Sequence, residues 1–243
     1  MARPSRTTTI VAVVIAIGFV VAALALTRSI PVEKVLGTKV YLPIFHGAST
    51  WVDIAVFLLM GILAIVYLFT RKSGVYAWEV GMRAVGAPLW ALNTALGLMA
   101  ALRTWDFTGS SESPLGTAIQ DPRLAAQFWL LLALGALLGL LVTLDKLWHK
   151  SVADLGFVAL MVVLLGNVLL DPAKKALHPD NPVLNSGMEI KGPFFGIVAC
   201  LGIAALVIAW TVSRYVRASL AEQIAAEGAS VPEAALPAEG EQR

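Results

Sequence analysis

The residues best suited to chemistry in this chain are two of its three histidines, His46 and His178. His46 lies in the segment IFHGASTW, residues 44–51, at the start of an apolar run, and His178 lies in a polar stretch between two later runs. A neutral imidazole has one ring nitrogen with a free lone pair, which can bind a metal or a haem iron. Two such side chains that meet can supply both axial ligands of a haem. The alternative is two unrelated histidines at a membrane interface.

Composition defines the class of protein that must position these side chains. The chain has 243 residues, of which 58% are hydrophobic and 14% charged, and its mean hydropathy is +0.79. These values predict an integral membrane protein. A net charge of +2 without a basic stripe argues against a nucleic-acid partner, and a single cysteine, Cys200, excludes an intrachain disulfide.

Six apolar runs are each long enough to span a bilayer as a helix, which predicts an all-α membrane domain over residues 1–217. The runs cover about 10–26, 52–69, 84–102, 124–144, 152–170 and 193–212. The first run could also be a signal peptide, since residues 23–25 resemble a cleavage site, but its length favours a retained helix. The polar tail, 218–243, is expected to pass from an amphipathic or frayed helix into disorder.

The connections between the runs alternate in length. Short polar connections are expected at 71–83 and 145–151, and long ones at 27–49, 103–123 and 171–192, so the long connections all fall on one face of the membrane. Lys and Arg are denser on the short-connection side, which the positive-inside rule places in the cytoplasm together with both termini. We therefore expect a multi-pass membrane protein; the resemblance described below implies the bacterial inner membrane.

Counting crossings places the histidines relative to one another. The chain crosses the membrane four times between His46 and His178, so both are predicted on the long-connection face. His149 is three crossings from His46 and is predicted on the opposite face, as an ordinary loop residue. This parity holds whether or not the first run is removed.

Other polar residues and glycines in the runs have structural interpretations first. Asp53 is expected near the boundary, bonded to first-turn backbone donors or to a loop cation, and is a functional candidate because it is an acid within a span. Asn93 is expected to make an interhelical hydrogen bond. Gly-x-x-x-Gly pairs at 135–139 and 192–196 would permit close helix packing.

Enzyme and transport functions are disfavoured on this sequence. It contains no phosphate-binding loop, no Gly-x-Ser-x-Gly, no His-Glu-x-x-His and no Cys-x-x-Cys-His motif, so we do not expect an enzyme. A permease is the least favoured function, because the predicted spans lack the paired buried charges typical of ion-coupled transport.

Several segments resemble the CcmC/CcsA family of haem-handling membrane proteins of cytochrome c maturation. Residues 44–51, followed by an apolar helix through Leu68, resemble the first histidine segment of that family. His178, followed by Met188 and the last run from Pro193, resembles the second. The resemblance covers about residues 42–217 and includes the six-helix layout.

This resemblance implies a cofactor, ligands and partners. The cofactor would be haem b, held at the extracytoplasmic face with His46 and His178 as axial ligands of the iron and with Trp51 as a further contact. The function would be to present haem to a periplasmic haem chaperone of the CcmE type. ABC-type membrane and ATPase subunits of the CcmB and CcmA types would be associated with the chain.

The family's tryptophan-rich WWD segment is degenerate here. The middle long loop contains Trp105 followed by Phe107, and Asp121-Pro122-Arg123-Leu124 matches the end of the motif, where an Asp-x-Arg-Leu leads into the fourth helix. By resemblance Trp105, Asp121 and Arg123 would contact haem. Asp121 and Arg123 could instead form a loop ion pair or a helix cap.

Loss of the tryptophan cluster leaves a second interpretation open. The chain could be a haem-bearing or structural membrane subunit of a respiratory electron-transfer complex, with the same two histidines retained.

Overall fold

The computed structural model describes residues 3–32, 37–108, 110–170, 183 and 186–229. Within this part of the chain the secondary structure is helical and no strand is present. The elements are α1 (Arg6–Arg28), a 3-10 turn (Thr38–Val40), α2 (Tyr41–Thr70), α3 (Ser73–Thr104), α4 (Pro114–Gln120), α5 (Pro122–Thr143), α6 (Leu147–Leu170) and α7 (Met188–Ala229).

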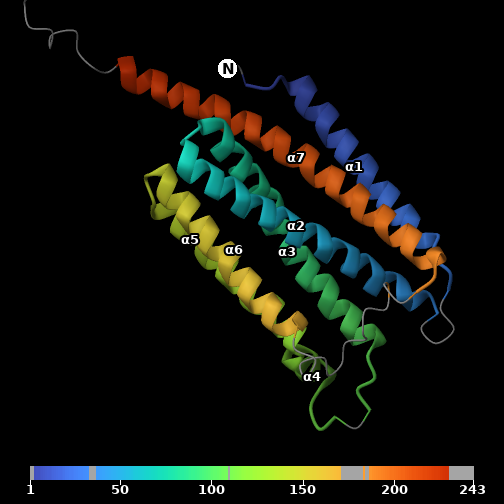
Figure 1. Ribbon diagram of the computed structural model, residues 1–243. Helices are drawn as coiled ribbons and strands as arrows, with labels where there is room; N and C mark the ends of the chain where they lie inside the picture. The colour runs from blue at the N-terminus through green and yellow to red at the C-terminus, as the bar shows by residue number, and fades with distance from the viewer. Residues whose placement is uncertain (1–2, 33–36, 109, 171–182, 184–185, 230–243) are drawn as a thin grey trace, which may run out of the picture.

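Six of these helices, all except the short α4, are long and apolar enough to cross a membrane. They form three layers (Figure 1): α2 and α3 lie in the middle, α1 and α7 cover one side, and α5 and α6 cover the other. The predicted all-α, six-span architecture is confirmed at this level. The helix ends that flank the three long connections also lie together at one end of the bundle, as the crossing count predicted.

Local sequence explains where several helices begin and end. Ser5 caps α1, because its side chain accepts a hydrogen bond from the backbone N–H of Thr8. Pro122 occupies the first turn of α5, where its missing N–H costs no hydrogen bond. Arg71 ends α2 in the left-handed region, with φ of 56°, and this reversal lets α3 begin at Ser73.

Two predicted connections are shorter than the sequence suggested. Residues 73–83, expected in a loop, form the start of α3, and residues 41–49, also expected in a loop, form the start of α2. The charges that argued for a loop at 73–83 are accommodated by partners on α6, described below. The first part of the polar tail, expected as an amphipathic or frayed helix, continues α7 as a helix to Ala229.

The middle of the bundle contains a cluster of packed aromatic rings. The ring of Phe57 on α2 lies edge-on to Trp90 of α3 and to Phe157 of α6, with centroid distances of 6.0 and 5.1 Å. Met60 and Met161 are fully buried in the same core. The long-connection end and the short-connection end are therefore separated by an apolar layer.

Glycines allow the closest helix contacts, and only one member of the Gly-x-x-x-Gly pairs that we singled out takes part. A Cβ atom on Gly135, Gly139 or Gly192 would meet no atom within 4 Å, while one on Gly196 would lie 2.9 Å from the Leu26 side chain of α1. A Cβ atom on Gly81 of α3 would instead overlap the backbone carbonyl of Ala209 on α7. Gly81 is therefore the position at which α3 and α7 pack backbone to backbone.

Replacement of Gly81 by valine should separate α3 from α7 and lower the free energy of unfolding by ~1–3 kcal/mol, the usual range for overpacking. The measurement is thermal or denaturant unfolding of the purified chain in detergent micelles. Gly139→Val is the matched control and should have little effect, since that position faces open space. Equal losses in both variants would contradict the assignment.

Candidate functional site

His46 lies on the inner face of α2 and is only 8% exposed. Ser49 and Asp53, at spacings that keep them on the same helix face, are buried as well. Because α2 begins at Tyr41, His46 lies within the bundle and not at the mouth of a span, where the sequence had placed it.

Asn93 of α3 holds the imidazole. Nδ1 of His46 lies 2.9 Å from Oδ1 of Asn93, and since an amide oxygen only accepts, Nδ1 is the donor. The same Oδ1 accepts from the hydroxyl of Ser49 at 2.6 Å, and Nδ2 of Asn93 donates to Oγ1 of Thr50 at 2.8 Å. The interhelical hydrogen bond predicted for Asn93 is confirmed, and it leaves Nε2 of His46 with the free lone pair.

Nε2 of His46 faces Gly97 of α3 and Gln127 of α5. A Cβ atom on Gly97 would lie only 2.7 Å from Cε1 of the imidazole, 3.0 Å from Nε2 and 3.1 Å from Oε1 of Gln127, so the ring packs directly against the backbone of α3. Oε1 of Gln127 is buried and has no hydrogen-bond partner among the described residues. A ligand bound through Nε2 would require the Gln127 side chain to move, and no hydrogen bond to its Oε1 holds that side chain in place. Because helices surround the His46 ring, the lone pair on its Nε2 is shielded from solvent.

Gln127 was missed by the sequence analysis. The sequence did contain an indication of its role, because Gln127 is a polar residue near the start of the apolar run 124–144. Trp90 holds its backbone in place by donating from Nε1 to the carbonyl oxygen of Gln127 at 3.2 Å. This bond fixes α5 against α3 at the depth of the site.

A pocket of about 560 Å³ lies at the same end of the bundle, between α1, α2 and α3. Three cations, Arg28, Lys39 and Arg103, line it together with the aromatic rings of Tyr41 and Phe45. Its volume is in the range of small-molecule sites, and guanidinium and ammonium groups favour carboxylate ligands. His46 does not line this pocket, although its neighbour Phe45 does.

Asp53 has a different environment from the one predicted. It is fully buried, more than two turns into α2, and neither carboxyl oxygen has a hydrogen-bond partner among the described residues. It neither caps the helix nor pairs with a loop cation. An unpartnered acid at this depth is a functional candidate by default.

A second polar cluster lies near the short-connection end. Arg83 of α3 forms an ion pair with Asp154 of α6, whose side chain is fully buried. Glu79, one turn before Arg83, accepts a hydrogen bond from the hydroxyl of Ser151 at 2.8 Å. The expectation that the spans lack paired buried charges is therefore wrong. Hydropathy placed Glu79 and Arg83 in a loop because it scores residues one at a time and cannot detect a partner on another helix.

The loop around Trp105 that resembled a WWD segment is packed against the ends of α3 and α5. Trp105 is half-buried, its ring lies 6.4 Å from that of Phe107, and both pack against a small core that includes Ala118 and Leu124. Next to it, Asp106 accepts hydrogen bonds from the hydroxyl and backbone N–H of Thr108, which lower the pKa of this exposed carboxyl below its ordinary value.

Asp121 is a helix cap. Its Oδ1 accepts from the backbone N–H groups of Arg123 and Leu124, at 2.9 and 3.3 Å, at the start of α5. The cap that the sequence offered as one interpretation is confirmed, and no Asp121–Arg123 side-chain ion pair forms. Nε of Arg123 is buried without a hydrogen-bond partner among the described residues.

Trp51, a predicted haem contact, lies on the face of α2 that meets α7 and not beside the imidazole. Trp51 is 51% exposed on α2 and its ring contacts Phe194 and Phe195 of α7 edge-on, at 6.2 and 6.4 Å. His178 lies outside the described residues, so its predicted meeting with His46 stays a prediction. His149, at the start of α6, stacks beside Trp148 at the short-connection end.

The fold and the six long apolar helices define the class as a multi-pass membrane protein. Beyond this class, no protein-family model matches the chain and no curated protein sequence matches it.

Breaking the buried ion pair should be costly. Arg83→Leu or Asp154→Leu alone leaves one uncompensated charge and should lower the free energy of unfolding by ~3–5 kcal/mol. The double variant should lose less than the sum of the two, which a double-mutant cycle in detergent measures. Arg3→Ala, which breaks the exposed Arg3–Glu222 pair, is the control and should change stability little. Additive losses at Arg83 and Asp154 would argue against the pair.

Proposed function

We propose that this chain is a haem-handling membrane protein of cytochrome c biogenesis, which holds haem b through His46 and His178 and presents it to a periplasmic haem chaperone. The proposal includes a location in the bacterial inner membrane and association with ABC-type membrane and ATPase subunits. Its support from the sequence is the resemblance to the CcmC/CcsA family at residues 44–51 and 121–124, in a chain with the six-helix layout.

The observation that carries the proposal is the way His46 is held. Oδ1 of Asn93 accepts a hydrogen bond from Nδ1–H, so the lone pair is on Nε2, which faces Gly97 and Gln127. A second group that orients the imidazole and fixes its tautomer is the usual arrangement for a histidine that binds a metal. An ordinary buried histidine would be expected to use both ring nitrogens in hydrogen bonds.

Haem b, when bound, supplies an iron that takes imidazole ligands and a ring that carries two propionates. Residues of the chain would orient the ligand and neutralise its charge. Asn93 would orient the His46 ring, the absence of a side chain at Gly97 would let this ring pack against α3, and Arg28, Lys39 or Arg103 would neutralise the propionates.

The loop 105–121 would offer the surface for the chaperone. Support for this part is the aromatic pair of Trp105 and Phe107, next to the cap at Asp121. Asp121 would act there as a positioning residue, because its carboxyl group is used to start α5.

The test of the ligands is the absorption spectrum of the chain purified from haem-replete membranes. Wild-type protein should show a low-spin haem b, and His46→Ala and His178→Ala should each lose it or convert it to high spin. His149→Ala is the control and should retain the wild-type spectrum. If His46→Ala and His178→Ala also retain it, the ligand assignment is wrong. Co-isolation with respiratory subunits instead of maturation proteins would favour the electron-transfer alternative.

Asn93→Leu should weaken haem binding by about 10–100-fold, because loss of the group that orients a ligating histidine commonly has an effect of this size. Haem titration of the apo-protein in detergent gives the affinity. Thr94→Val is the matched control, since Thr94 bonds only to the backbone of its own helix, at Trp90. Equal affinities for wild-type protein and Asn93→Leu would show that the Asn93 contact is structural only.

A further inference from the structure

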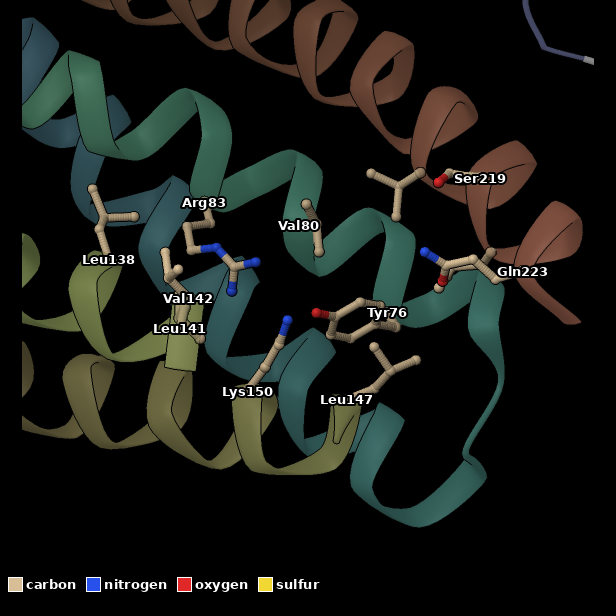
Figure 2. Close-up of a pocket in the computed structure, with 12 residues that line it drawn as sticks. Tyr76, Val80, Arg83, Leu138, Leu141, Val142, Leu147, Lys150, Ser219 and Gln223 are labelled. Carbon is tan, nitrogen blue, oxygen red and sulfur yellow. The ribbon is translucent and has the colours of Figure 1, made fainter. Parts of the chain in front are cut away.

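The short-connection end of the bundle contains a pocket that the proposed haem site does not use. It has a volume of about 460 Å³ and is formed by α3, α5, α6 and α7. Figure 2 shows the guanidinium of Arg83, the ammonium of Lys150 and the hydroxyl of Tyr76 turned toward the same space. Ser219 and Gln223 of α7 add a hydroxyl and an amide at its edge.

The charged residues that line this pocket favour an anionic ligand. Its lining includes two cations and no carboxylate. Arg83 is paired with Asp154, but Lys150 forms no ion pair within the described part of the chain. The start of α6, where Lys150 lies, adds the partial positive charge of a helix N-terminus. Cationic donors and a hydroxyl in one small space suit the oxygens of a phosphate group.

The apolar walls of the pocket favour an amphiphilic ligand. Leu138, Leu141 and Val142 of α5 form one side, and Val142 is 86% exposed on the outer face of its helix. An acyl chain can follow this apolar face while a headgroup meets the cations. The depth is suitable, because Tyr76 and Lys150 lie in the first turns of α3 and α6, where spanning helices enter the headgroup region.

We propose that this pocket binds the phosphate headgroup of an anionic phospholipid, with Lys150, Arg83 and Tyr76 as its donors. Basic pockets between spanning helices are typical sites for anionic headgroups. The site is at the opposite end of the bundle from His46, and the proposal does not depend on haem binding.

The experiment measures binding of phosphatidylglycerol to the full chain in detergent, by native mass spectrometry and by the lipid-induced rise in Tm. Phosphatidylglycerol should bind more tightly than phosphatidylcholine. Lys150→Gln should weaken phosphatidylglycerol binding about fivefold, and Lys150→Arg should retain it. Tyr76→Phe should weaken binding in the same direction.

Lys146→Gln is the matched control, because it removes a cation from the same connection without touching the pocket. It should change the affinity less than Lys150→Gln does. Equal binding of the two lipids, or no effect of Lys150→Gln, would overturn the proposal. Inorganic phosphate that displaces the lipid and itself raises Tm in a Lys150-dependent way would identify a free phosphate site and overturn the lipid assignment.

Discussion

Hydrocarbon offers no hydrogen-bond partner, so a buried polar group in this bundle is stabilised by a partner on another helix. Several such contacts involve α3: Asn93 with His46 on α2, Trp90 with the Gln127 carbonyl on α5, and Arg83 and Glu79 with Asp154 and Ser151 on α6. Apolar packing alone would tolerate small shifts of one helix along another. These contacts fix the register of α3 against its neighbours, and the His46 site depends on that register.

The aromatic layer of Phe57, Trp90 and Phe157 divides the molecule into two polar regions. On one side lie His46, Asn93 and the cation-lined pocket, and on the other lies the Arg83 cluster. The side chains of this layer are buried and apolar, and no hydrogen bond between described residues crosses it. The His46 region and the Arg83 cluster are therefore separated by apolar packing.

Much of the fold could be predicted from the sequence, because a membrane-spanning helix requires a long apolar run, and such a run can be read directly from the residue types. The six spans, the alternation of connection lengths and the importance of Asn93 followed from such patterns. The start of α3 did not, since Glu79 and Arg83 are acceptable in a span only through partners far away in sequence. For the same reason the environment of Asp53 and the role of Gln127 had to come from packing.

The length of α7 has a consequence for both polar regions. Its 42 residues give a rod of roughly 63 Å, about twice the thickness of the hydrocarbon core. Phe194 near its start contacts Trp51 at the His46 end, and Ser219 and Gln223 near its end line the pocket at the short-connection end. Because α7 packs against α1, α2 and α3, one continuous helix borders both polar regions. The distance between these two regions is therefore set by the length of a single helix.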